Sequence, residues 1–217
     1  MPSTITAVRH GQSESNVAFA RAEADGVAVV LTGLDEDVPL TLFGRGQATA
    51  LGRRLAEGEA PEVVWCSPYL RAVQTWELAA AHLDASPEVR LDARLGDRRM
   101  GRLAGMNLAA IRESFPEEAD RLLRSEHTYR APDGESFSDV ADRVREVVAA
   151  MRAECAGRRV LVVAHDTVVL MFKHVIEGIP LDSVVVFAPV LNASLSVWRG
   201  SRPEIFNDDA HLRDITV

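Results

Sequence analysis

Residues Thr4 to Asn16 read T-I-T-A-V-R-H-G-Q-S-E-S-N, and this stretch decides the fold. The apolar and β-branched run at its start is typical of a buried strand. The run ends at Arg9, His10 and Gly11, after which small polar residues follow. Because open α/β sheets bind ligands at the carboxyl ends of their strands, the stretch predicts a ligand site directly after a strand.

The composition limits the classes of protein to consider. With 217 residues, 47% hydrophobic and 26% charged, the chain fits one globular domain over residues 1–217. A net charge of −8 argues against nucleic-acid partners, and no apolar run is long enough for a membrane partner. Cys66 and Cys155 lack the spacing of metal ligands. The N-terminus lacks a secretory pattern, so we expect a reduced, cytoplasmic setting.

Predicted strands and helices alternate along the chain, which indicates the α/β class. The strand at 194–198 is expected at a sheet edge, where it could pair with a second copy to form a homodimer. The polar tail from 202 to 217 is expected to lie on the surface. Strands are predicted at 4–8, 63–66, 89–91, 159–164, 184–187 and 194–198.

Polar residues mark the expected starts of the helices. Thr41 is a candidate N-cap, and Ser67 followed by Pro68 suits a hydroxyl cap with proline at the first helical position. Asp166 is expected to cap the helix that it begins. The clearest amphipathic helix spans 136–155, with valines recurring on one face.

Residues 96–135 are less regular than the rest of the chain. Gly101, Gly105 and Pro116 interrupt short helical patches there. We expect this region to be an insertion that forms a lid over the site at the sheet edge.

A second strand ends in the same way as the first. The run R-V-L-V-V-A at 159–164 is followed by His165, and Arg71 lies one turn into a helix after another buried strand. If the strands are parallel neighbours, these side chains converge with Arg9 and His10 beside helix N-termini. Two imidazoles and two guanidinium groups at one place form a site for a tetrahedral dianion.

Four segments resemble the conserved segments of the histidine phosphatase superfamily, which includes the cofactor-dependent phosphoglycerate mutases. They occur in the family's order, and together they are far more specific than R-H-G alone. The resemblance implies an α/β fold of the phosphoglycerate mutase type, a three-layer αβα sandwich with a mostly parallel central sheet. The segments are R-H-G-Q-S-E-S-N at 9–16, P-L-T-L-F-G-R-G-Q-A at 39–48, S-P-Y-L-R-A-V-Q-T at 67–75 and V-V-A-H at 162–165.

The resemblance also implies a role for each residue of the site. His10 would be the nucleophile that forms a phosphohistidine, while Arg9, Arg71 and His165 clamp the phosphate oxygens and Asn16 reaches from the loop. Phosphoryl transfer needs an in-line nucleophile and positive charge around three equatorial oxygens, which agrees with these roles. Because the arginines supply that charge, we expect neither a metal ion nor another cofactor.

The leaving group needs a proton, and family members use Glu or Asp in the segment after the third strand. Asp97, four residues before Gly101, matches that spacing, although most relatives have Glu there. Glu135 in P-D-G-E-S is the alternative acid. A second departure is Asp166, where relatives commonly have Gly, and besides capping its helix it could lie near the phosphate and weaken anion binding.

Three arginines lie beside the expected acid. Arg98, Arg99 and Arg102 either form a solvated basic patch or hold a second anionic group of the substrate. The second interpretation favours a sugar phosphate, a phosphoglycerate or a bisphosphate. The expected substrate-binding residues are Asn16, Gly11, Ser13, Arg98 and Arg102.

These residues favour a metal-independent phosphomonoester hydrolase of the histidine acid phosphatase type, which acts on a small phosphorylated metabolite through phospho-His10. A cofactor-dependent phosphoglycerate mutase is the alternative, because G-R-L-A-G-M-N resembles its counterpart in that enzyme. A non-catalytic binder of phosphorylated ligands is a third hypothesis. Loss of His10, Arg71 or His165 would have supported it, and all three are present.

Overall fold

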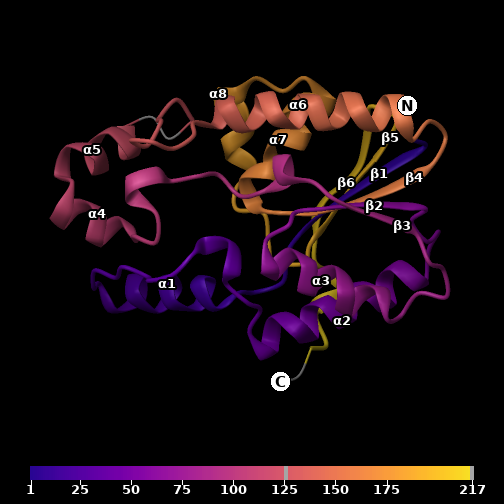
Figure 1. The fold of residues 1–217 in the computed structure, drawn as a ribbon, viewed down its shortest axis with the longest axis horizontal. Helices are drawn as coiled ribbons and strands as arrows, with labels where there is room; N and C mark the ends of the chain where they lie inside the picture. Colours follow the sequence, from indigo (N-terminus) through magenta and orange to yellow (C-terminus); the bar gives the residue numbers. More distant parts are fainter. Residues whose placement is uncertain (125–126, 216–217) are drawn as a thin grey trace.

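A mixed sheet lies at the centre of the computed structural model, which describes residues 1–124 and 127–215 (Figure 1). Six strands are described, in the order β3-β2-β4-β1-β5-β6. The first four of these strands are mutually parallel, and β5 runs antiparallel to both of its neighbours. The strands are β1 (Thr4–Arg9), β2 (Val63–Cys66), β3 (Glu88–Leu91), β4 (Arg159–Ala164), β5 (Leu195–Arg199) and β6 (Arg202–Asp208).

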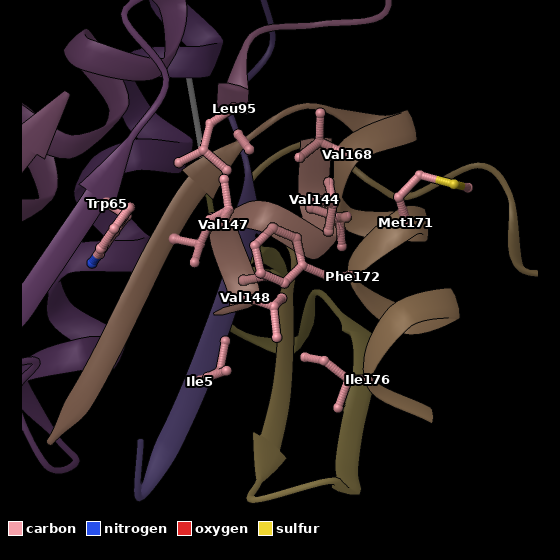
Figure 2. Close-up of a cluster of buried hydrophobic side chains, with 14 of the residues drawn as sticks. Ile5, Trp65, Leu95, Val144, Val147, Val148, Val168, Met171, Phe172 and Ile176 are labelled. Carbon is pink, nitrogen blue, oxygen red and sulfur yellow. The ribbon is translucent and has the colours of Figure 1, made fainter. Parts of the chain in front are cut away.

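Helices cover both faces of the sheet, which confirms the three-layer αβα sandwich (Figure 1). Ile5 of β1 faces α6 (Phe137–Glu154) and α7 (Asp166–Glu177), where it joins a large buried cluster (Figure 2). Val8 of the same strand faces the opposite side and packs with α2 (Leu42–Ala56) and α3 (Leu70–Ala80). Alternate side chains of a strand point to opposite faces, so one buried strand supplies both cores.

Local chemistry sets several helix boundaries, and the N-cap predicted at Thr41 is confirmed. The Oγ1 of Thr41 accepts a hydrogen bond from the N–H of Gly44 at 2.9 Å and caps α2. Ser136 caps α6 through a capping box with Asp139. Gly178 ends α7 in the left-handed conformation, where a residue without Cβ is favoured.

Two predictions about the later strands are wrong. Residues 184–187 form no strand, because Pro180 starts the short helix α8 (Leu181–Val184), which continues as a 3₁₀ turn at Val185–Phe187. The segment contacts α7 and buries Val184 in the core, so tertiary packing overrides the β propensity of the valine run.

The strand predicted at 194–198 lies inside the sheet and not at its edge. β5 pairs with β1 on one side and with β6 on the other, so it offers no free edge for a homodimer. The segment 202–208, predicted as surface tail, is the strand β6 and occupies the edge. Its residues are mostly exposed, so no apolar alternation reveals the strand in the sequence.

Residues 96–124 and 127–135 extend beyond the carboxyl ends of the strands. They include α4 (Leu108–Ser114) and α5 (Pro116–Arg124), which project from the sheet beside α1 (Glu14–Asp25) in Figure 1. Backbone contacts join this region to the segment after α1, where Leu31 N–H donates to the carbonyl of Gly105. It has its own small core of Leu103, Ile111, Ala119, Tyr129 and Ala131.

Candidate active site

The two histidines predicted at the strand ends face each other. Arg9 pairs in register with Ala164, so His10 and His165 follow neighbouring parallel strands at the same edge of the sheet. Their ring centroids lie 5.1 Å apart, and both side chains are buried. The pairing of β1 with β4 therefore brings together residues that are 155 positions apart in the chain.

Hydrogen bonds fix the tautomer of His10. Its Nδ1 lies 2.7 Å from the carbonyl oxygen of Gly11, which can only accept, so Nδ1 carries the hydrogen. The lone pair is then on Nε2, which accepts a hydrogen bond from Nε of Arg71 at 3.2 Å. Nε2 of His10 is therefore the nitrogen able to act as a nucleophile.

Two arginine side chains border His10, of which Arg71 is buried and Arg9 is partly buried. Arg71 comes from the first turn of α3, and its Nη2 lies 3.1 Å from Asp35 Oδ2 and 3.2 Å from Asp97 Oδ2. Arg9, at the end of β1, donates through Nη1 to the carbonyl of Val190. Its Nε is buried without a hydrogen-bond partner in the described part of the chain, so it can donate to an anion.

Ser67 orients His165 and does not cap a helix. Its Oγ lies 2.9 Å from Nε2 of His165, whereas α3 begins only at Leu70 and Tyr69 is its N-cap. The predicted cap at Ser67 and the helical position of Pro68 are therefore wrong. Nδ1 of His165 is buried, has no hydrogen-bond partner among the described residues and faces the site.

The two candidate acids have different surroundings. Asp97 lies in the site, with Oδ2 placed 3.4 Å from His165 Nδ1. Glu135 is buried away from His10 and is held by Arg143 at 3.1 Å and by the N–H of Arg99 at 3.0 Å. Burial raises the pKa of the Glu135 carboxyl, but these contacts outweigh it and lower the pKa overall. Glu135, the alternative acid, thus belongs to a structural ion pair with Arg143.

Both imidazoles are neutral near pH 7. Burial lowers the pKa of His10 well below its usual value, and His165, Arg71 and Arg9 lower it further. Burial, followed by Arg71 and Arg9, lowers the pKa of His165 in the same way. A neutral His10 retains the lone pair that an attack on phosphorus requires.

Asp166 does not cap its helix. His165 occupies the N-cap position, and no side chain caps α7. Asp166 Oδ1 accepts from the N–H of Val190 at 3.1 Å, and Oδ2 lies 3.7 Å from Arg9 Nη1. The second interpretation, an acid close to the anion site, fits this geometry better.

Three of the expected substrate-binding residues have structural contacts. Ser13 is fully buried and caps α1, with its Oγ 3.3 Å from the N–H of Asn16. Asn16 lies on α1 and not in a loop, and it borders the pocket while closing the capping box. A Cβ on Gly11 would lie 2.5 Å from the carbonyl oxygen of Gly44, so glycine serves the packing against α2.

The arginines after Asp97 do not form one rim. Arg98 borders the pocket, but its guanidinium donates to the carbonyls of Glu135 and Tyr129. Arg102 stacks over Phe115, with 5.5 Å from Cζ to the ring centroid, and does not border the pocket. The prediction that both bind substrate is not supported by these contacts.

Sequence reasoning missed four residues that contact the site. Asp35 pairs with Arg71, although its acidic turn reads as an ordinary loop signal. Asn192 donates through Nδ2 to the carbonyl of His10 at 3.0 Å, and it lies in a segment without a motif. Tyr69 packs against His165, and Thr75 Oγ1 accepts from the N–H of Gly11. The last two belong to the quoted segment 67–75 and could have been found there.

A cavity of about 540 Å³ opens above His10. His10, Arg9, Arg71 and Asp97 line this cavity together with residues of 98–106 and Leu122. Helix α7 begins beside it, with Asp166 and Thr167 in the lining. A cavity of this size has room for a small ligand, and the arginines in its lining suit an anionic group.

The model of the histidine phosphatase superfamily, branch 1, matches residues 5–205. The chain belongs to this family. A 2,3-bisphosphoglycerate-dependent phosphoglycerate mutase from Rhizobium etli is 31% identical over 91% of this chain and 90% of the mutase. A 6-phosphofructo-2-kinase/fructose-2,6-bisphosphatase from Caenorhabditis elegans is 34% identical over 77% of the chain. The matched part of the chain spans only 33% of the length of that protein.

The solved structure of a mycobacterial glucosyl-3-phosphoglycerate phosphatase is also similar to this chain. The two chains are 26% identical, with a TM-score of 0.75 over 94% of this chain and 98% of the other. Within 1–124 and 127–215, no three His, Cys, Asp or Glu side chains are grouped as metal ligands. Over the same residues, no helix combines the length and apolar character that crossing a bilayer requires.

Proposed function

We propose that this histidine phosphatase is a metal-independent phosphomonoester hydrolase that acts on small phosphorylated metabolites through phospho-His10. The observation that carries the proposal is the lone pair on His10 Nε2. The Gly11 carbonyl holds the ring hydrogen on Nδ1, and Nε2 lies 3.2 Å from Arg71 Nε. Arg9 and Arg71 supply the positive charge that stabilises the transferring phosphoryl group. The mycobacterial phosphatase and the family model support hydrolysis.

The reaction would proceed in two displacements. Nε2 of His10 attacks phosphorus while the bond to the leaving oxygen breaks, and protonated Asp97 donates its proton to that oxygen. In the second step the Asp97 carboxylate takes a proton from water, the water oxygen attacks phosphorus, and the P–N bond breaks. Phosphate leaves, and both His10 and Asp97 return to their starting protonation states.

The proposal is tested with His10→Ala on p-nitrophenyl phosphate. The variant should lose nearly all turnover and should form no acid-labile phosphoenzyme, whereas His82→Ala, distant from the site, should retain both. EDTA should leave the wild-type rate unchanged. Retained turnover in His10→Ala, or a rate that EDTA abolishes and a metal restores, would refute the mechanism.

A phosphoglycerate mutase is the second candidate, favoured by the similarity to the Rhizobium enzyme. The same purified protein is assayed for conversion of 3- to 2-phosphoglycerate with 2,3-bisphosphoglycerate present. A hydrolase should release phosphate without this conversion. Conversion faster than phosphate release would favour the mutase.

A further inference from the structure

Asp35 places a negative charge beside the phosphate-binding arginine. It lies in the 3₁₀ turn Asp35–Asp37, where its Oδ2 is 3.1 Å from Arg71 Nη2 and its carbonyl accepts from Nη1. The Asp35 side chain is 51% exposed, and it borders the cavity. A substrate group that extends toward this part of the cavity would meet that charge.

The charges around the cavity nearly balance before a substrate binds. Four arginines line it, and three aspartates lie among them besides Asp97, the proposed proton donor. A phosphate dianion held by Arg9 and Arg71 uses two of the positive charges, so the part of the cavity that holds the leaving group becomes net negative. The lining groups are Arg9, Arg71, Arg98 and Arg99 with Asp35, Asp97, Asp133 and Asp166.

The remaining arginines are held by other groups. Arg98 binds two backbone carbonyls and stacks over Phe137, 4.8 Å from Cζ to the ring centroid. Arg99 extends outward with 71% of its side chain exposed, and its Nη2 lies 3.6 Å from Glu135. These contacts differ from the fork that grips a second phosphate or carboxylate.

Apolar side chains make up much of the cavity wall. Phe19 on α1 faces the region that contains Leu103, Met106 and Leu122, and all four line the cavity. Burying an apolar substrate group against this wall is favourable, whereas burying an ionised group there is not. The cavity thus suits a leaving group that is uncharged and partly apolar.

We infer that Asp35 selects phosphomonoesters whose leaving group is neutral and partly apolar, and disfavours substrates that carry a second anion there. The inference rests on the proposed hydrolase function and names its substrate class. It sets this chain apart from the three relatives above, whose names all contain a phosphoglycerate or a bisphosphate.

The test compares 4-carbamoylphenyl phosphate with 4-carboxyphenyl phosphate, which have nearly the same shape and differ by one charge. The wild type should prefer the neutral compound in kcat/KM. Asp35→Asn should reduce that preference by about three- to tenfold, because it removes one carboxylate several ångströms from the second anion. Glu36→Gln, in the same turn but outside the cavity lining, should leave the preference unchanged.

The ratio of kcat/KM for the two compounds separates a role of Asp35 in substrate specificity from a role in positioning Arg71. If Asp35 only positions Arg71, the variant changes kcat/KM for both compounds by the same factor, and the inference is overturned. Equal wild-type rates, or a preference for the carboxylate, also overturn it while the hydrolase function stands. If the wild type hydrolyses none of the three compounds, p-nitrophenyl phosphate included, the proposed function itself is refuted.

Discussion

At the scale of single residues, the site combines neutral imidazoles with permanent cations. The Gly11 carbonyl places the His10 hydrogen on Nδ1, and Arg71 lies against the lone pair on Nε2. Burial and the neighbouring positive charges lower the pKa of His10 and of His165. A lowered pKa keeps the lone pair of His10 available near neutral pH, as the proposed hydrolysis requires.

The lowered pKa values predict how stability depends on pH. Above about pH 6.5 His10 is neutral in both states and adds no pH dependence. As the pH falls from 6.5 toward the folded pKa, only the unfolded chain takes up the proton, so stability decreases. Urea unfolding at pH 7.5 and 5.5 should show that the wild type loses about 1 kcal/mol more than His10→Gln. Equal losses would show that His10 titrates normally.

The two candidate acids differ at this scale, because Asp97 lies in the site and Glu135 forms an ion pair with Arg143. Asp97→Asn should slow hydrolysis of alkyl phosphates, which need a proton on the leaving oxygen, by about 10²-fold or more. Its effect on p-nitrophenyl phosphate should be much smaller. Measuring kcat for leaving groups of increasing basicity checks this, and a uniform loss would assign the proton to another group.

Glu135→Gln should act on stability and not on the chemistry. It leaves the Arg143 guanidinium without its charged partner in a largely buried place, at a cost of about 3 kcal/mol. Urea unfolding measures the loss, and the dependence of kcat on the leaving group should remain that of the wild type. A steeper dependence would return Glu135 to the role of proton donor.

The site was predictable from sequence where a strand end identifies the residue. His10, Arg9 and His165 follow buried apolar runs, and Arg71 follows another after a short connection. Asp35 and Asn192 come from segments whose positions depend on how loops pack over the sheet edge. No local periodicity encodes that packing, so only the structure reveals their contacts.

At the scale of elements, the loop after His10 and the start of α2 pack backbone against backbone. A Cβ at Gly44 would lie 2.0 Å from the carbonyl oxygen of Gln12, so the loop after His10 would have to move. Gly44→Ala should lower kcat/KM by about tenfold or more, because small displacements of a nucleophile are costly. Gly46→Ala, where a Cβ meets only a side-chain carbon at 3.2 Å, should retain activity. Similar rates for both variants would contradict the argument.

The predicted elements hold where burial gives a regular pattern. β1, β4 and α6 bury continuous or periodic apolar residues, and their predicted bounds differ little from the observed ones. β6 carries little buried surface, and residues 184–187 read as a strand only because of their valines. Edge position and tertiary contacts determine such segments, and neither is a local property.

At the scale of the whole molecule, the buried apolar side chains of residues 1–124 and 127–215 form three separate clusters. Two of them join the sheet to its helices, whereas the third lies within 103–131. Leu103, which belongs to this third cluster, also lines the cavity. Small clusters joined to a domain by few contacts open more easily than its main core. On this basis we propose that the region 96–135 acts as a lid over the cavity. Residues 125 and 126 of this region lie outside the described residues.

The lid and the sheet should therefore respond differently to the loss of a buried aliphatic side chain. Ile111→Ala removes a 2%-exposed side chain from the third cluster, and Val147→Ala removes a fully buried one beneath the sheet. Ile111→Ala should speed hydrogen exchange within 101–124 and raise KM for substrates that reach Leu103, while β1 and β4 keep their protection. Val147→Ala should lower the global free energy of unfolding by about 2 kcal/mol. If Ile111→Ala instead reduces protection in β1 and β4 as strongly as in 101–124, the region unfolds together with the sheet and cannot open as a lid.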